Sequence, residues 1–209
     1  TGFEAWAGLG PSGRAAAMRR LAALIDEHND EIARIETLDM GFLHRSMRER
    51  LVGRGALNFR TYADLVDGAV DETWSARGTR HRVQLMPAGP AVVITPWNAP
   101  FMLATWKIAP ALAAGNSVIL KPAEWSPLSA ALLGELTVEA GFPPGAFNVV
   151  QGIGEEVGPP LVSDPRVRRI SFTGSPETGR IIAGAAARNL VPFTGELGGK
   201  GALIVCADS

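Results

Sequence analysis

Two polar side chains of this sequence stand where they could take part in chemistry. Asn98 lies between Pro96 and Pro100, directly after a β-branched apolar run. A side-chain amide fixed at the end of a strand can donate a hydrogen bond to a developing oxyanion, although a turn-forming Asn is the simpler alternative. Glu196 is followed by Leu197 and two glycines, which let the backbone bring its carboxylate close to a reacting centre, where it could serve as a general base.

A cation and a carboxylate follow a second apolar run. Lys121 and Glu124 could each hydrogen-bond the adjacent hydroxyls of a ribose. Because the carboxylate would repel a 2′-phosphate, this pair favours NAD over NADP. The alternative is a surface ion pair that contributes about 0 to 1 kcal/mol to stability.

Two further segments could hold phosphate groups. Gly154 and Gly158 belong to a glycine-rich stretch, but its G-x-G-x-x-x-G spacing departs from the dinucleotide fingerprint and is weak alone. Gly174 permits close backbone approach, Ser175 is a candidate N-cap and Pro176 suits the first helical position. The free amides of that helix could bind a phosphate, yet an ordinary capped helix would have the same sequence.

These residues require a scaffold of alternating strands and helices. Such alternation, with continuously apolar strands, predicts a parallel sheet covered on both faces and joined by right-handed crossovers. The fold class is therefore α/β, a Rossmann-like doubly wound sheet, in which ligands bind outside the carboxyl ends of the strands. Strands are expected over residues 80–86, 91–95, 117–120, 147–150, 169–172, 190–193 and 202–205, and helices over residues 101–114, 128–140, 155–162 and 176–188.

The N-terminal third has a helical pattern instead. Apolar residues recur at three-and-four spacing over residues 14–40, with a break near Asn29, and a second helix is expected over residues 44–66, weakened by Gly53 and Gly55. We therefore divide the chain into a helical segment, residues 1–79, that packs on a dinucleotide-binding domain, residues 80–209. Residues 68–78 are polar enough to form a surface connection. The expected core contacts of the second helix are Leu51, Leu57, Phe59, Tyr62 and Leu65.

Composition excludes several classes of function. Twenty basic and 21 acidic residues leave a net charge of -1, so no global field attracts nucleic acid or an anionic membrane, and no apolar run approaches the length of a membrane span. Partners should be small molecules or proteins. Cys206 is the single cysteine, which excludes an internal disulfide framework and suits the cytoplasm. No metal site is expected, because His28, His44 and His81 share no ligand spacing.

Taken together and in order, four segments resemble the aldehyde dehydrogenase superfamily. The resemblance covers nearly the whole chain, with the helical third matching the helices that precede the cofactor domain, but it does not cover the whole family protein. The segments are Ile94-Thr95-Pro96-Trp97-Asn98, Lys121-Pro122-Ala123-Glu124, Phe172-Thr173-Gly174-Ser175 and Glu196-Leu197-Gly198-Gly199-Lys200.

The resemblance implies NAD-dependent oxidation of an aldehyde or semialdehyde to the carboxylic acid. In that family a Cys thiolate attacks the aldehyde, hydride passes to the nicotinamide and water hydrolyses the thioester. Asn98 would stabilise the oxyanion, Glu196 would be the general base, and Lys121 and Glu124 would hold the adenosine ribose. The remaining residues expected at the cofactor are Ile94, Thr95, Pro96, Trp97, Gly154, Gly158, Phe172, Gly174, Ser175, Gly179 and Leu197.

The nucleophile is expected to lie outside this chain. In the family it follows the Glu-Leu-Gly-Gly-Lys segment at some distance, whereas Cys206 is only ten positions after Glu196, in an apolar run where a small buried strand residue is expected. The chain thus resembles a fragment without the catalytic domain, inactive alone, of a protein that forms homo-oligomers.

Three details of function stay open at this point. Residues 58–65 are similar to members that act on hydroxymuconic semialdehydes. A nucleotide-binding module without catalysis is an alternative, as is a branch that passes the acyl group to phosphate or coenzyme A. Glu196 favours hydrolysis over acyl transfer.

Overall fold

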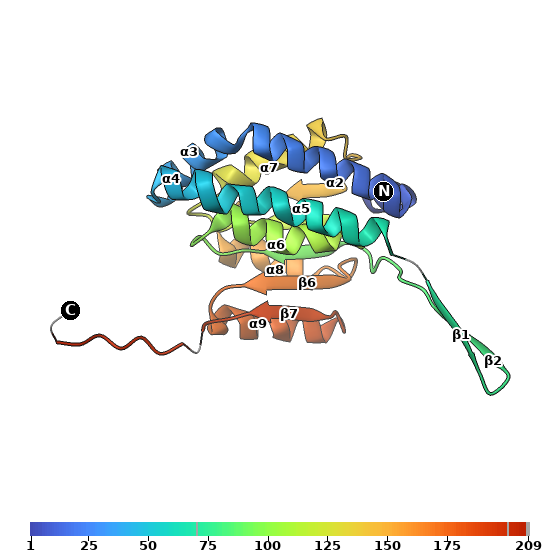
Figure 1. The fold of residues 1–209 in the computed structure, drawn as a ribbon. Helices are drawn as coiled ribbons and strands as arrows, with labels where there is room; N and C mark the ends of the chain where they lie inside the picture. The colour runs from blue at the N-terminus through green and yellow to red at the C-terminus, as the bar shows by residue number, and fades with distance from the viewer. Residues whose placement is uncertain (70, 200, 208–209) are drawn as a thin grey trace.

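The computed structural model describes residues 1–69, 71–199 and 201–207. A five-stranded parallel sheet lies between two layers of helices, with the N-terminal helices stacked outside one layer (Figure 1). Lys200, part of the fourth segment above, lies outside the described residues.

The helical N-terminal third is confirmed. Its elements are α1 (Gly2–Gly8), α2 (Gly10–Glu27), α3 (Asn29–Met40), α4 (His44–Ser46), the π-helical stretch η1 (Met47–Leu51) and α5 (Val52–Asp67). The expected break near Asn29 falls at His28, between α2 and α3. The sequence did not predict α1, which a capping box between Thr1 and Glu4 closes at its start.

The parallel sheet is also confirmed, with the strand order β5-β4-β3-β6-β7. Its central strand β3 pairs with β4 on one side and with β6 on the other, so that Ile94 lies opposite both Lys121 and Phe172. The order of the strands reverses between β3 and β6, which is where doubly wound sheets open a crevice. The elements are β3 (Ala91–Ile94), α6 (Pro100–Ala113), β4 (Val118–Lys121), α7 (Leu128–Glu139), β5 (Phe147–Val149), α8 (Gly154–Ser163), β6 (Arg169–Thr173), α9 (Pro176–Arg188) and β7 (Phe193–Glu196).

Two hydrophobic cores lie on opposite faces of this sheet. Successive strand residues point to opposite faces, and accordingly Val93 belongs to the core under α6 and α7 while Val92 belongs to the core under α8 and α9. The N-terminal helices join the first core through Trp6, which is fully buried. Its ring stacks on Phe142 with centroids 4.5 Å apart, and its indole nitrogen donates to the carbonyl of Leu112 at 2.9 Å.

A two-stranded hairpin corrects the expected surface connection. Strands β1 (Glu72–Ala76) and β2 (Thr79–Val83) pair antiparallel and project from the body (Figure 1). The polar composition of this stretch predicts a surface connection, yet from Glu72 onward the backbone is paired with β2. A tight turn with positive φ at Arg77 and Gly78 joins the two strands. The division at residues 79 and 80 falls inside this hairpin and stays a prediction.

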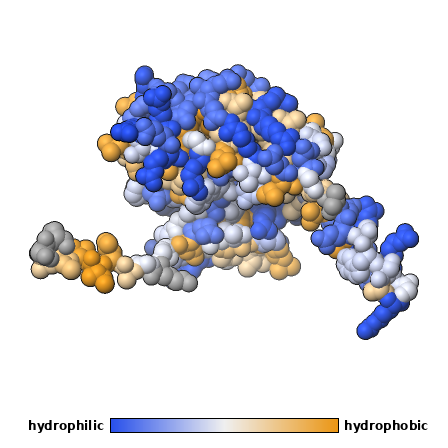
Figure 2. All heavy atoms as spheres, viewed as in Figure 1, coloured by the Kyte–Doolittle hydropathy of each residue, from blue (hydrophilic) through white to orange (hydrophobic). Residues whose placement is uncertain are grey.

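The expected C-terminal strands are shifted or lacking. The strand placed over residues 190–193 begins instead at Phe193, since Leu190 takes a positive φ after α9. Residues 202–205 form no strand, because no neighbouring strand within the described chain lies beside them, and Cys206 is exposed instead of buried. In Figure 2 this arm is largely apolar in colour and stands away from the body.

Several apolar residues expected in the core lie at the surface. Leu57 and Leu65 of α5 are 54% and 62% exposed, while Phe59 is buried. An apolar stripe read from spacing alone fixes the buried side of a helix only to within a residue or two. Among the described residues no helix is both long enough and apolar enough to cross a bilayer.

Two glycines of α5 allow a matched test of how this helix packs. A Cβ at Gly55 would lie 2.5 Å from a ring carbon of Phe101 on α6, whereas nothing lies within 4 Å of a Cβ at Gly53. We expect Gly55→Ala to lower the free energy of unfolding by about 1 to 3 kcal/mol through overpacking. Gly53→Ala should raise it by about 0.5 to 1 kcal/mol through helix propensity. Urea denaturation of both variants checks this, and equal effects at the two positions would contradict close α5–α6 packing.

Candidate active site

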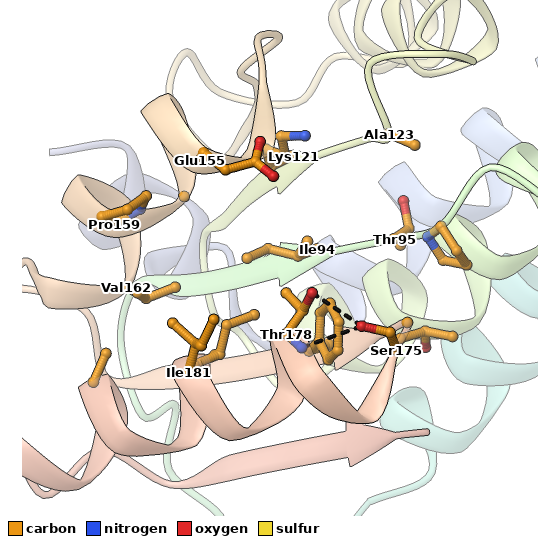
Figure 3. A pocket seen from close by; sticks show the side chains of 18 of the residues that line it. Ile94, Thr95, Lys121, Ala123, Glu155, Pro159, Val162, Ser175, Thr178 and Ile181 are labelled. Carbon is orange, nitrogen blue, oxygen red and sulfur yellow. Dashed lines mark hydrogen bonds between the residues drawn. The ribbon is translucent and has the colours of Figure 1, made fainter. Parts of the chain in front are cut away.

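A cavity of about 560 Å³ opens at the carboxyl ends of β3, β4 and β6, between α8 and α9 (Figure 3). Its position is the point at which the strand order reverses. This cavity is lined by most of the residues that the sequence analysis expects at the cofactor, namely Ile94, Thr95, Pro96, Trp97, Lys121, Glu124, Gly154, Gly158, Phe172, Gly174 and Ser175.

Lys121 and Glu124 form an ion pair at this cavity. The ammonium donates to the carboxylate at 2.9 Å, with the Lys121 side chain 4% exposed and that of Glu124 37% exposed. The hydrogen bond from Lys121 lowers the pKa of Glu124 below its ordinary value, so the carboxylate is ionised at neutral pH. Lys121 is buried and both groups line the cavity, so this ion pair lies only partly at the surface.

The starts of α8 and α9 face each other across the cavity. Ser175 caps α9, since its hydroxyl oxygen accepts from the Thr178 amide at 3.1 Å and its hydroxyl donates to the Thr178 hydroxyl at 3.0 Å (Figure 3). No side chain caps α8. Gly174 has no space for a side chain, because a Cβ there would lie 2.4 Å from the ring of Phe172. Gly174 also lines the cavity, and without a Cβ its backbone leaves room for close approach by a ligand.

A second cavity of about 680 Å³ lies beside the first. Thr173, the last residue of β6, borders both cavities. Asn98 and Glu196 line the second one, so the fold brings together two residues that are 98 positions apart in the chain. The lining residues are Asn58, Tyr62, Asn98, Leu103, Trp106, Lys107, Thr173, Glu196 and Leu197.

Lys107 adds a charge that sequence reasoning missed. Its ammonium donates to the Ser171 hydroxyl at 3.1 Å. Burial lowers the pKa of Lys107 below its ordinary value, and the nearby Glu196 carboxylate opposes this shift. The signal that could have found Lys107 is its position on α6, four residues after Leu103. This spacing puts both side chains on one side of the helix, toward the same cavity.

A buried carboxylate supports the loop that carries Asn98. Glu36 of α3 is 2% exposed and accepts a hydrogen bond from the Phe101 amide, in the first turn of α6, at 3.4 Å. Desolvation raises the pKa of Glu36, opposed by hydrogen bonds from Ser129 and Phe101. The helical N-terminal segment thus contacts the helix that begins two residues after Asn98.

Two nominated residues lie apart from the first cavity. Leu197 lines the second cavity. Gly179 packs against Leu197, since a Cβ on Gly179 would be 2.7 Å from the Leu197 side chain. The ligand roles of all these residues stay predictions.

Three tryptophans lie at least partly at the surface. Trp74 is 48% exposed on the hairpin, where it stacks on His81, while Trp106 and Trp125 are 44% and 70% exposed. Trp106 lines the second cavity, and Trp125 lines the first beside Trp97 with ring centroids 6.3 Å apart. An aromatic residue on a cavity wall has the same sequence pattern as one in a core. In the part of the chain that the structure describes, no three His, Cys, Asp or Glu side chains are placed to hold a metal ion.

The fold is a doubly wound parallel sheet with two adjoining cavities at the carboxyl edge of its strands. Residues 1–209 match the description of the aldehyde dehydrogenase family, and the chain belongs to that family.

Relatives and solved structures agree with this membership. The chain is 45% identical to phenylacetaldehyde dehydrogenase from Pseudomonas fluorescens, over 98% of this chain and 42% of that protein. It is 42% identical to 5-carboxymethyl-2-hydroxymuconate semialdehyde dehydrogenase from Escherichia coli, over 99% and 44%. The NAD+ complex of an aldehyde dehydrogenase from Bacillus cereus superposes with a TM-score of 0.93 at 35% identity, over 99% of this chain and 43% of that one. The chain therefore spans less than half the length of these relatives.

The effect of the Glu196 carboxylate on the pKa of Lys107 can be tested directly. Glu196→Gln removes the attractive carboxylate, so the pKa of Lys107 should fall further below its ordinary value. The chain has three lysines, which makes their ¹⁵N or ¹³C side-chain signals simple to assign in an NMR titration. Glu135→Gln, on the exposed side of α7, is the control and should leave Lys107 unchanged. A rise in the Lys107 pKa on Glu196→Gln would contradict the described geometry.

Proposed function

We propose that this chain is the cofactor-binding part of an enzyme that oxidises an aldehyde or semialdehyde to its carboxylic acid with NAD. The observation that carries the proposal is the meeting of two cavities at Thr173, one lined by the nominated nucleotide-binding residues and the other by Asn98 and Glu196. Aldehyde dehydrogenases of similar fold have been solved in complex with NAD+.

The first cavity fits a dinucleotide in three respects. Its volume of about 560 Å³ lies in the range of cofactor sites. Lys121 and Glu124 can hydrogen-bond the two hydroxyls of a ribose, and the start of α9, with the open backbone at Gly174, can lie beside the pyrophosphate. A bound nicotinamide would supply the hydride acceptor for the reaction. The shared border at Thr173 supports a reaction between ligands held in the two cavities.

In the second cavity the residues of this chain handle charge and protons. The Asn98 side-chain amide donates to the oxygen that becomes negative when the carbonyl carbon is attacked. The Glu196 carboxylate accepts the proton of the water that hydrolyses the acyl intermediate. Lys107 holds a positive charge beside Glu196.

The thiol nucleophile belongs, in this proposal, to a part of the protein outside residues 1–209. Cys206 is a poor candidate because it is exposed on the arm after β7 and lines neither cavity. We further propose, on the family resemblance, that the intact protein is a cytoplasmic homo-oligomer. The projecting hairpin of β1 and β2 supports self-association, since its outer edges carry unpaired backbone groups.

The ribose assignment predicts a cofactor preference. The intact protein should use NAD with higher kcat/KM than NADP, because the Glu124 carboxylate repels a 2′-phosphate. Glu124→Gln should reduce the NAD to NADP ratio of kcat/KM by about tenfold, the effect of one charged hydrogen bond. Glu135→Gln serves as control. Equal efficiency of the unsubstituted protein with both cofactors would remove Glu124 from this role.

The base assignment predicts a selective loss of hydrolysis. Glu196→Gln in the intact protein should slow release of the acid from a preformed acyl-enzyme by about 100-fold or more, the usual contribution of a general base. Rapid-quench measurements separate this step from the earlier burst of NADH formation. Turnover equal to that of the unsubstituted protein would exclude Glu196 from the mechanism.

A further inference from the structure

The loop that carries Asn98 is anchored at both ends. At its start the Thr95 amide donates to the carbonyl of Lys121 at 3.2 Å, which continues the pairing of β3 with β4. At its end the Phe101 amide, in the first turn of α6, donates to the Glu36 carboxylate of α3 at 3.4 Å. The position of Asn98 therefore depends on one contact with the sheet and on one contact with a helix of the N-terminal segment.

The start of α6 depends on Glu36 because the adjoining chain does not cap it. Ala99 is the N-cap residue and has no side-chain oxygen, and Pro100, the first helical residue, has no N–H. Phe101 thus carries the first amide of α6 that needs an acceptor. The carboxylate that accepts from this amide comes from 65 positions earlier in the chain. A negative group at this end of the helix is also favoured by the helix dipole.

Two constrained residues connect this contact to Asn98. They are Ala99 and Pro100, and both are buried. The carbonyl of Ala99 accepts from the Leu103 amide at 2.9 Å, while the ring of Pro100 fixes its φ near about −65°. Because few torsions between Phe101 and Asn98 are free, a shift of the Phe101 amide also moves Asn98.

Burial makes Glu36 a costly residue for its place on α3. A carboxylate that is removed from water needs hydrogen bonds to offset its lost hydration. Asp39, which lies one turn further along α3, is only partly buried and accepts from the Leu128 amide at the start of α7 at 3.2 Å. Each of these two carboxylates thus contacts the start of a different helix, and the one that contacts α6 is Glu36.

We propose that Glu36 is a positioning residue for the reaction, which fixes the start of α6 through the Phe101 amide and so holds the Asn98 side chain where the oxyanion forms. This inference rests on the proposed function, because the role of Asn98 belongs to it. A misplacement of a reacting group by about 1 Å can cost about 100-fold in rate, so a contact outside the cavity can control the reaction within it.

Three substitutions separate the hydrogen-bond acceptor of Glu36 from its charge. Glu36→Gln keeps the length and an acceptor oxygen, Glu36→Met keeps the length without an acceptor, and Glu36→Asp keeps the charge on a side chain that is too short. In the intact protein, with hexanal and NAD, Glu36→Gln should keep kcat/KM for hexanal within about threefold. Glu36→Met and Glu36→Asp should lower it by about 10- to 100-fold. The KM for NAD should stay within about twofold in all three variants, because Glu36 does not line the first cavity.

A double-mutant cycle tests whether Glu36 acts through Asn98. Asn98→Ala should lower kcat/KM for hexanal by about 100-fold or more, as the loss of an oxyanion donor does. Glu36→Met added to Asn98→Ala should lower it by less than about twofold further, because the donor that Glu36 positions is already absent. Glu36→Asp replaces Glu36→Met in the cycle if that variant does not fold. The control is Thr37→Val, which removes a hydroxyl that donates to the Ala33 carbonyl within α3, and it should leave kcat/KM unchanged.

The possible outcomes distinguish the two proposals. Full activity of Asn98→Ala contradicts the proposed role of Asn98 and the inference with it. When Asn98→Ala is impaired, three results overturn the inference alone. They are full activity of Glu36→Met, greater activity of Glu36→Asp than of Glu36→Gln, and losses that add in the double variant. The second result would assign the effect to charge, and the third to a loss of structure that does not pass through Asn98.

Discussion

The arrangement depends on the pairing of β3 with a strand on each side. Because Ile94 lies opposite Lys121 in β4 and Phe172 in β6, the chain leaves three neighbouring strands at one edge of the sheet. The helices that follow must diverge to opposite faces, and their separation at this edge creates the first cavity. The buried alternation of Val92 and Val93 between two cores holds β3 in this register, since a shift by one residue would exchange the faces.

Thr173 lies where the two cavities meet. As the last residue of β6 it borders both cavities, so a ligand that extends past it passes from one to the other. The register that pairs Thr173 with Glu196 of β7 brings the carboxylate to the same edge. Neither residue needs a dedicated loop, because the ends of paired strands already place them.

The sequence predicted the elements better than their surroundings. The strand that ends at Ile94, the ion pair of Lys121 and Glu124, and the capped start of α9 at Ser175 all depend on local chemistry that spacing reveals. The sequence predicts β2, over residues 80–86, but not β1 or the pairing of the two strands. The side chains of the hairpin are solvated on both sides, which removes the alternating pattern of a half-buried strand. The strand expected over residues 202–205 failed for the opposite reason, since an apolar run specifies burial without supplying a partner.

The candidate site shows the same limit. Motifs located Asn98 and Glu196, but no pattern in the sequence could bring Lys107 or Trp106 to them, because both belong to an ordinary amphipathic helix.

The two sides of α5 make different contacts, and this has a consequence for how such a protein diversifies. Gly55 and Phe59 anchor one side of the helix to the core, whereas Asn58 and Tyr62 line the second cavity. Substitutions at Asn58 and Tyr62 change the lining of the second cavity, while the sheet and the first cavity keep their contacts. Under the proposed function, a lineage could therefore change the aldehyde that it accepts through a few substitutions on α5, with the proposed cofactor site unchanged.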